Sequence, residues 1–326
     1  MKYNKIALVF PGQDSRYVGM GKELYDKFKC VRDVYDKASQ VLKYDISKKC
    51  FKKSNLGKRV LRRTELDKAI YAQPAVLTTS YACFRVLEER CKQCNVDLSV
   101  SFLAGHSVGE YTAFLVSGAM DFKTCLNLVQ KRASYITEID KTCAATGLMA
   151  IADKAKGFHY ERIRSLCESF GVYVSQNNTK SEIVVGGYKK SLSKLSKELR
   201  KRGSLTKMLK AEGPLHTPIM KQAAEKFKIE LDKYNFYIAS KPTIANVTTE
   251  AIVDPNHIRK ELYEQVYGIV DWRGSIEKAI NDGGDLFIEV GPGRVLSNMI
   301  EGIDSSIPKL NVEDIGSLEK TVRELT

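Results

Sequence analysis

The segment that most constrains the fold of this chain is Phe102–Ser117, which contains Gly105-His-Ser-Val-Gly109, a Gly-x-Ser-x-Gly sequence. Apolar residues before the motif predict the end of a buried strand, and the apolar spacing after Val108 predicts a helix. A serine at such a turn has a strained backbone, and the flanking glycines leave space for it. The pattern therefore predicts a nucleophilic Ser107 at a helix N-terminus, where free N–H groups favour a developing oxyanion.

The alternative is a chance match, because short peptides of small residues often satisfy this pattern. The predicted strand before the motif and the predicted helix after it supply the context that a nucleophile elbow requires. We therefore take Ser107 as the candidate nucleophile.

A serine nucleophile needs a base, and histidine is the usual one at neutral pH. The chain has four histidines. His106 adjoins the serine, so its side chain is expected to point away and support the turn. His159 lies in a charged segment and His257 follows a turn signal. Elimination leaves His216, which follows the serine in the order of α/β hydrolases; the alternative is an ordinary surface histidine.

Two further roles stay open at this level. Asp271, Glu289 or a backbone carbonyl could orient the histidine, and a sequence does not reveal carbonyls. Arg132 lies at the edge of the apolar face of a helix predicted from Phe122 to about Ile136. Such an arginine either extends to solvent, which is the commoner case, or pairs with a carboxylate in a pocket.

The order of predicted elements changes along the chain. Between residues 142 and 212, short strands alternate with charged helices, which indicates an α+β insertion. Outside this block, buried-strand character is present at Lys5–Phe10, Pro242–Thr248 and Leu286–Val290. Helices are predicted at Met20–Cys30 and Val31–Leu42, and another one begins with Pro74 in its first turn.

Composition describes an ordinary globular protein, with 43% hydrophobic and 28% charged residues. The first residues do not resemble a signal peptide, and no apolar run is long enough for a membrane span. We therefore expect a cytoplasmic protein that does not enter membranes. The eight cysteines are scattered, and Cys91-Lys-Gln-Cys94 has no second metal-binding pair, so reduced thiols are expected rather than zinc.

The formal net charge of +13 indicates an acidic partner. Two runs concentrate the charge, Lys48–Arg63 and Lys194–Lys210. Neither run carries the interleaved aromatics of a nucleic-acid-binding segment, so we expect no nucleic-acid partner. A solvated face would explain each run separately, whereas an acidic protein partner would explain both.

These motifs together resemble the malonyl-CoA:acyl carrier protein transacylases of fatty-acid synthesis and the related acyltransferases of polyketide synthases. The resemblance extends from Val9-Phe-Pro-Gly-Gln13 to Glu289-Val-Gly-Pro-Gly-Arg-Val-Leu296. Each block is weak alone, but their order and spacing are specific. The blocks between these ends are Gln73-Pro-Ala75, Gly105-His-Ser-Val-Gly-Glu-Tyr111, Arg132, Gly213-Pro-Leu-His216 and Asn246-Val-Thr248.

The resemblance implies an α/β protein with an α/β-hydrolase-like core, residues 1–141 and 213–326, and an inserted ferredoxin-like α+β subdomain, residues 142–212. It implies an enzyme that moves a malonyl group from malonyl-CoA to the phosphopantetheine thiol of an acidic acyl carrier protein, in fatty-acid or polyketide synthesis. A monomer with malonyl-CoA as substrate and no tightly bound cofactor or metal is expected. The alternatives are an acyl hydrolase of the same fold and a noncatalytic carrier-protein-binding module.

The resemblance also assigns roles to individual residues. Ser107 would carry the acyl group, with His216 as base and then acid, and Arg132 would bind the malonate carboxylate in place of the solvent position expected above. The N–H groups of Gln13 and Val108 would form the oxyanion hole. Supporting roles fall on His106, on Asn178 and on Asp271, whose backbone carbonyl would hold the histidine.

Two departures from the family pattern stand out. The family loop is usually Gly-Gln-Gly-Ser-Gln, and here it is Gly12-Gln-Asp-Ser-Arg16. Asp14 should oppose anion formation beside the oxyanion hole unless Arg16 neutralises it. Leu215 replaces a phenylalanine that is common in the family, which should leave more room at the acyl group and loosen selectivity.

Overall fold

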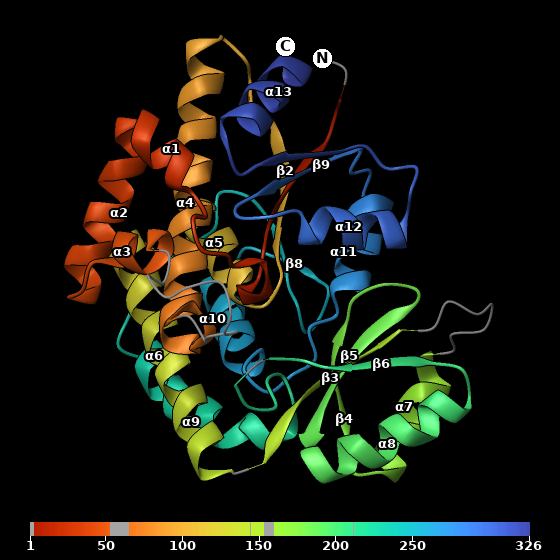
Figure 1. The fold of residues 1–326 in the computed structure, drawn as a ribbon. Coiled ribbons are helices and arrows are strands. Elements are labelled where there is room, and N and C mark those ends of the chain that lie inside the picture. The colour runs from red at the N-terminus through yellow and green to blue at the C-terminus, as the bar shows by residue number, and fades with distance from the viewer. Residues whose placement is uncertain (1–2, 53–64, 144, 153–159, 211) are drawn as a thin grey trace.

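The computed structural model describes residues 3–52, 65–143, 145–152, 160–210 and 212–326, and it contains two β-sheets (Figure 1). The larger sheet has the strand order β10-β9-β1-β2-β7-β8. Every neighbouring pair in it is parallel except β7 with β8, which is antiparallel. Its strands are β1 (Ile6–Phe10), β2 (Val100–Gly105), β7 (Thr243–Ile244), β8 (Ala251–Ile252), β9 (Leu286–Val290) and β10 (Lys309–Val312).

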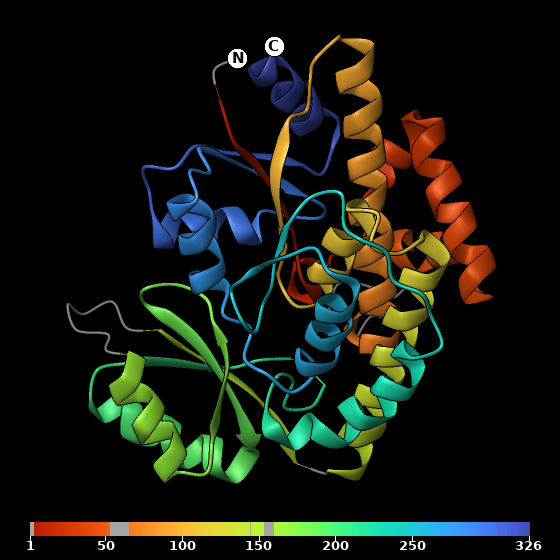
Figure 2. The same cartoon turned by 180° about the vertical axis from the view of Figure 1, so that it is seen from behind.

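Helices cover both faces of this sheet, as Figures 1 and 2 show from opposite sides. Alternate residues of β1 enter different apolar clusters: Leu8 packs with the N-terminal helices, and Val9 packs with Trp272 at the start of α11. Burial on both faces explains why β1 and β9 are continuous apolar runs rather than alternating ones. The helices are α1 (Lys22–Lys27), α2 (Lys29–Leu42), α3 (Ile46–Phe51), α4 (Ala69–Gln93), α5 (Val108–Val116), α6 (Phe122–Thr142), α9 (Lys221–Leu231), α10 (Pro255–Glu264), α11 (Trp272–Asn281), α12 (Val295–Ile303) and α13 (Ile315–Leu325), with 3-10 turns η1 (Gln13–Ser15), η2 (Glu65–Asp67) and η3 (Pro218–Met220).

The smaller sheet is antiparallel throughout and has the strand order β4-β5-β3-β6. Its elements follow one another as strand, helix, strand, strand, helix, strand, which is the ferredoxin-like order. The predicted fold class is therefore confirmed, while the exact limits 142 and 212 stay a prediction. The elements are β3 (Thr146–Ala152), α7 (Tyr160–Ser169), β4 (Tyr173–Asn177), β5 (Glu182–Tyr188), α8 (Lys189–Lys201) and β6 (Leu205–Met208).

Two helix predictions were wrong at their ends. The helix predicted to begin at Ala72, with Pro74 near its first turn, begins three residues earlier at Ala69, so Pro74 lies inside α4. Both Ala69 and Ala72 are buried, and this burial extends the helix towards its N-terminus. The helix predicted at Met20–Cys30 is α1 and ends at Lys27, because Phe28 is extended, with φ −108° and ψ 129°.

A short segment after α10 joins the two sheets. Val270 pairs with strand β4 of the smaller sheet: its N–H donates to the Ser175 carbonyl at 3.0 Å, and its carbonyl accepts from Asn177 N–H at 2.9 Å. This pairing holds residues 265–271 between the core and the subdomain. Within the described residues, no helix has the length and apolar character needed to cross a membrane.

Candidate active site

Ser107 occupies the turn between β2 and α5, as the motif predicts. Its backbone has φ 52° and ψ −113°, in a region that residues with side chains rarely adopt. A Cβ atom on Gly105 would lie 2.1 Å from the Gly109 carbonyl carbon, and one on Gly109 would lie 2.0 Å from the Phe10 carbonyl oxygen. Any larger residue would clash at either position, so the sharp turn against β1 requires glycine at both.

The hydroxyl of Ser107 contacts His216. The distance from Ser107 Oγ to His216 Nε2 is 2.7 Å, and His216 Nδ1 lies 2.6 Å from the backbone carbonyl of Gln265. A carbonyl only accepts hydrogen bonds, so Nδ1 carries the proton and Nε2 is free to accept one from the serine. Burial, with a smaller contribution from the nearby Arg132 charge, lowers the pKa of His216 to about 3. The imidazole is therefore neutral at physiological pH, as a general base must be.

Arg132 is buried next to the serine rather than exposed to solvent. Its side chain is 1% exposed, and Nη2 donates to Ser107 Oγ at 3.3 Å. The other acceptors are side-chain oxygens of Gln73 at 2.8 Å and Gln265 at 3.0 Å. Burial lowers the pKa of Arg132 from its usual range. Within the described part of the chain no carboxylate lies within ion-pair distance of Arg132, and the three side-chain oxygens that accept from it are uncharged.

Gln265 and Asn246 hold the site together, and sequence reasoning assigned a role to neither. The Gln265 side-chain amide donates to the Ser107 carbonyl at 2.8 Å and to Glu110 at 2.6 Å. The Asn246 side chain accepts from Ser107 N–H at 2.8 Å and donates to the Gly105 carbonyl at 2.6 Å. Asn246 belongs to the Asn-Val-Thr block that carried the resemblance, which was a usable signal. Gln265 stands in no such block.

Two backbone N–H groups are the candidates for the predicted oxyanion hole. Val108 N–H is at the N-terminus of α5, directly after the serine, and Gln13 N–H begins η1 in the loop after β1. Neither group donates a hydrogen bond to an atom of the described residues. Free N–H groups at helix N-termini are the usual donors of oxyanion holes.

The family of this chain follows from comparison with known proteins. The family described as acyl transferase domain matches residues 7–325. The chain belongs to this acyl transferase family. The resemblance inferred from the motifs is thereby confirmed.

Individual acyl transferases of the family are similar over nearly the whole chain. A malonyl CoA-acyl carrier protein transacylase of Bacillus subtilis (strain 168) is 32% identical over 329 residues, which cover 99% of this chain and 98% of that protein. The solved malonyl CoA-acyl carrier protein transacylase from Coxiella burnetii has a TM-score of 0.89 at 27% identity, covering 99% of this chain and 98% of the other. A malonyl-transacylase solved in complex with its type II polyketide synthase acyl-carrier protein has a TM-score of 0.89 at 28% identity, covering 98% and 100%.

The expectation for Asp271 was wrong in this acyl transferase. The carbonyl that faces His216 belongs to Gln265, six positions earlier. The Asp271 carbonyl accepts from Ser275 of α11, and its side chain caps that helix through Gly274 N–H and accepts from Asn177. Asp271 thus supports the segment next to the site and does not contact the histidine.

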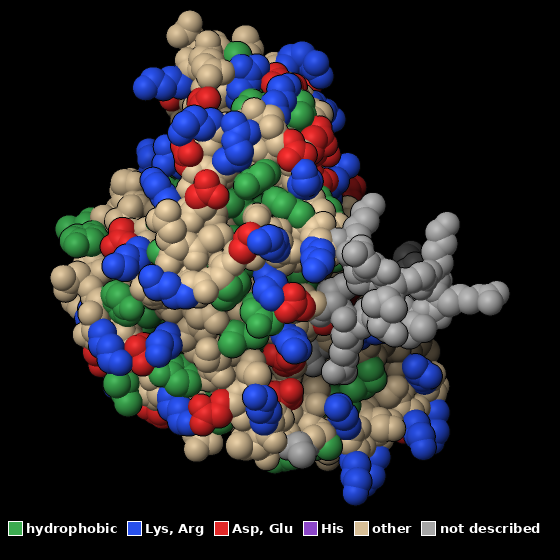
Figure 3. Space-filling model, turned by 60° about the vertical axis from the view of Figure 1, so that its left-hand side comes forward, with side chains coloured by type: hydrophobic (Ala, Val, Ile, Leu, Met, Phe, Trp, Pro, Cys, Tyr) green, Lys and Arg blue, Asp and Glu red, His purple; other side chains and the backbone are tan. Residues whose placement is uncertain are grey.

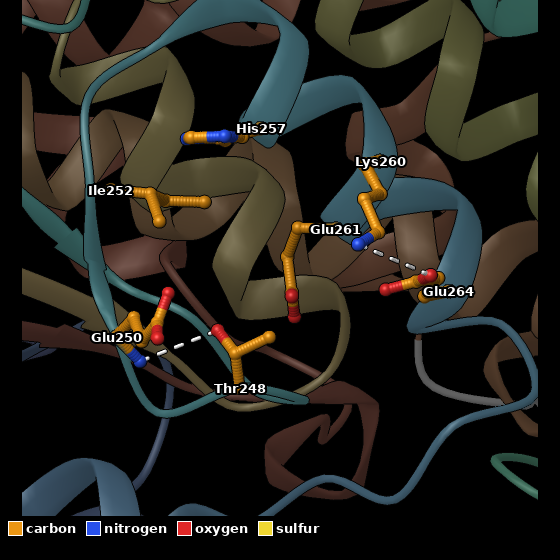
Figure 4. Close-up of a pocket in the computed structure, with 7 residues that line it drawn as sticks. All are labelled: Thr248, Glu250, Ile252, His257, Lys260, Glu261 and Glu264. Carbon is orange, nitrogen blue, oxygen red and sulfur yellow. Dashed lines mark hydrogen bonds and ion pairs between the residues drawn. The ribbon is translucent and has the colours of Figure 1, made fainter.

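The other candidates for orienting or replacing the base lie elsewhere. Glu289 accepts hydrogen bonds from Leu296 and Ser297 at the start of α12. His257 is exposed on α10 and lines a separate surface pocket (Figure 4). His159 lies outside the described residues. The remaining residues around this pocket are Thr248, Glu250, Ile252, Lys260, Glu261 and Glu264.

The predicted supporting residues His106 and Asn178 contact each other, and the predicted substrate-binding residue Leu215 is buried directly before His216. His106 is 5% exposed, and its Nε2 lies 3.1 Å from the Asn178 side-chain oxygen. This contact links the turn to the subdomain strand region, as expected of a side chain that points away from the nucleophile. Leu215 is 3% exposed, and its carbonyl accepts from Ser175 at 2.7 Å, which fixes the backbone directly before His216.

Proposed function

We propose that this chain is a malonyl-CoA:acyl carrier protein transacylase that works through a malonyl-Ser107 intermediate. The observation that carries the proposal is the placement of a buried guanidinium beside a serine that also contacts a neutral histidine. Arg132 has no ion-pair partner among the described residues, and the free carboxylate of a malonyl group would supply one. The site therefore suits a malonyl thioester better than an uncharged acyl chain.

In the first half-reaction, Ser107 Oγ attacks the thioester carbonyl while His216 Nε2 takes the serine proton. The carbonyl oxygen becomes an oxyanion, which the N–H groups of Gln13 and Val108 stabilise. The carbon–sulfur bond then breaks, and the CoA thiolate leaves with the proton that His216 returns. Malonyl-serine remains, with its free carboxylate against Arg132.

The second half-reaction is the reverse sequence with a different thiol. The phosphopantetheine thiol of the carrier protein gives its proton to His216 and attacks the malonyl-serine carbonyl. The oxyanion forms in the same place, and Ser107 leaves when His216 returns the proton to Oγ. Serine, histidine and backbone N–H groups supply every step, so the mechanism uses no tightly bound cofactor or metal.

The carrier protein is the second substrate that we assign to this chain. The net charge of +13 favours an acidic protein, and the solved relative in complex with an acyl-carrier protein supports such a partner. We place the reaction in the cytoplasm, where the eight cysteines would remain reduced. The carrier would serve fatty-acid or polyketide synthesis.

The experiment that tests this function is intact-protein mass spectrometry after brief incubation with malonyl-CoA. A malonyl adduct should form on the wild-type protein, be absent from Ser107→Ala, and move to a phosphopantetheinylated carrier protein when one is added. An adduct that decays to free malonate and leaves the carrier unmodified would show an acyl hydrolase instead. No adduct from malonyl-CoA, but one from an uncharged acyl-CoA, would contradict the malonyl assignment.

A further inference from the structure

Arg16 connects the loop after β1 to the 3-10 turn η2 that precedes α4. Its Nε donates to the carbonyl of Leu66 at 2.5 Å, and its Nη1 donates to the carbonyl of Gln13 at 2.9 Å. Two carboxylates flank the same guanidinium, Asp14 and Asp67, each with an N···O distance of 3.6 Å. The Arg16 side chain is only 14% exposed, so these contacts are partly shielded from solvent and salt.

The contact with the Gln13 carbonyl matters because Gln13 supplies one of the two candidate oxyanion donors. The carbonyl also accepts the backbone N–H of Arg16 at 3.2 Å, which closes η1. On its other side, the Gln13 side chain accepts from Gln73 at 3.1 Å, and Gln73 accepts from Arg132. Gln13 is therefore held at its side chain by Gln73 and at its backbone by Arg16.

Asp14 places a negative charge next to the candidate oxyanion donor Gln13, and this charge needs a cation nearby. Glycine usually stands at this position in the family, and here a carboxylate follows the candidate oxyanion donor directly. Burial lowers the pKa of His106 next to Ser107, and the Asp14 charge acts on it in the opposite direction, so this charge reaches the active-site turn. A negative charge at that range opposes the development of a second one on the substrate oxygen. Asp14 is 57% exposed, and the cation beside it is Arg16.

We propose that Arg16 is a positioning residue of the transfer reaction, which fixes the Gln13 peptide and neutralises Asp14 so that the oxyanion donor stays effective. The substrate in this proposal rests on the proposed function. The role of Arg16 can also be tested with a reagent that carries no malonyl group. Asp14 and Arg16 are then a matched pair: each departs from the usual family residue, and the arginine compensates for the aspartate.

The test is a double-variant cycle on the full chain, with Arg16→Gln, Asp14→Gly and both together, which restores the usual family loop. The first readout is the rate of Ser107 acylation at saturating malonyl-CoA. We expect Arg16→Gln to lower this rate about tenfold, because an oxyanion donor acts in the transition state. The malonyl-CoA concentration at half saturation should change less than about twofold, because Gln73 still holds the Arg132 side of the site. The double variant should recover to within about threefold of wild type.

The second readout is labelling of Ser107 by a fluorophosphonate, in which Oγ attacks phosphorus, fluoride leaves and His216 takes the proton. This reaction uses the same oxyanion donors and no malonyl group. The same order of rates is expected with this reagent. If malonyl-CoA gave no adduct while labelling still followed Arg16, the proposed function would fail and the role of Arg16 would stand.

The matched control is Arg90→Gln, which also removes one arginine charge. Arg90 lies near the C-terminus of α4, whereas Gln73 of the site lies near the N-terminus of the same helix. Arg90 binds Glu319 through Nε at 3.2 Å and Nη2 at 3.0 Å, and it lies about 25 Å along the helix from Gln73. Its acylation and labelling rates should equal those of wild type. The proposal is overturned if Arg16→Gln reacts as fast as wild type, or if the folded double variant, checked by thermal unfolding, is no faster than Arg16→Gln.

Discussion

Ser107 and His216 share an unusual backbone conformation, with φ angles of 52° and 57°. Residues with side chains adopt such angles only where their surroundings hold them, at a cost of about 1–3 kcal/mol each. Around Ser107 the holding contacts are the Asn246 and Gln265 side chains, and His216 is held through the Gln265 carbonyl. Gln265 thus contacts both residues, the serine through its side chain and the histidine through its carbonyl, which helps to fix the distance between them.

The sequence alone could reveal residues whose role is local. Ser107 is recognisable from Gly105 and Gly109, which stand two residues before and after it. Both glycines are required by close contacts within the same turn and with β1. Arg132 was ambiguous without the family resemblance, because its partners Gln73 and Gln265 lie 59 and 133 positions away. Gln265 was missed altogether, since its backbone carbonyl has no sequence signature and its side-chain partners all come from distant segments.

Replacement of Arg132 by alanine should remove the preference for malonyl over acetyl groups. The loss of a buried partner for a charged group costs several kcal/mol, so acylation of Ser107 by malonyl-CoA should slow by about 100-fold or more. Acylation by acetyl-CoA should change much less, because the acetyl group has no carboxylate. The measurement is the ratio of the two acylation rates in one preparation of variant protein, so that any general loss of active protein cancels. An unchanged ratio would remove Arg132 from malonate recognition.

At the scale of elements, burial decided which predictions held. Lys5–Phe10 and Leu286–Val290 were recognisable as strands, and they became β1 and β9, because burial on both faces leaves a continuous apolar run. The start of α4 was misplaced because proline usually marks a first helical turn, whereas tertiary burial continues this helix to Ala69. Element ends depend on such contacts more than on local sequence preference.

The junction between β9 and α12 should make the unfolding free energy depend on pH. Glu289 is 1% exposed, and it accepts N–H groups of Leu296 and Ser297 at the start of α12. Burial, partly offset by these hydrogen bonds, raises the pKa of Glu289 to about 7 from 4.5. Between these values the unfolded chain releases a proton that the native state keeps, so stability falls as pH rises through this window.

The variant Glu289→Gln has no proton to release and should escape this loss. Its unfolding free energy relative to wild type should therefore rise by about 3 kcal/mol between pH 5 and pH 8, and level off above the native pKa. Urea unfolding of both proteins in the same buffers measures the difference, and contributions from other titrating groups cancel. A difference that is equal at both pH values would mean that Glu289 ionises as easily in the native state as in the unfolded chain.

At the scale of the whole molecule, the candidate active site lies where the two sheets meet. Ser107 follows strand β2 of the core sheet and Asn178 follows strand β4 of the smaller sheet. Leu215 comes shortly after the last strand of the smaller sheet, and Val270 pairs with β4. The division into a core and an α+β insertion could be predicted, because it is a change in element order along the chain. The pairing of Val270 with β4 could not, since a single bridge between distant segments leaves no periodic pattern.

The distribution of charge belongs to the same scale. The basic run on α8 forms the solvent side of an amphipathic helix whose leucines are buried, so this run is also explained as a solvated face. Most of the other run, Lys48–Arg63, lies outside the described residues. Lysine and arginine side chains are nonetheless spread over the face shown in Figure 3, among fewer acidic ones. A net charge of +13 on the whole chain attracts an acidic partner over a long range, before the two surfaces touch.

Transfer to the carrier protein should therefore depend on salt. Raising NaCl from about 50 to about 500 mM should lower kcat/KM for an acidic carrier at least about tenfold, because screening removes the long-range attraction. The control acceptor is pantetheine, a neutral thiol that reacts with the same malonyl-serine without a protein surface. Its rate should change less than about twofold. Starting both reactions from preformed malonyl-enzyme excludes any effect of salt on the binding of anionic malonyl-CoA. Equal salt dependence for the carrier and for pantetheine would mean that the basic excess does not serve carrier recognition, and that it is a solvated surface alone.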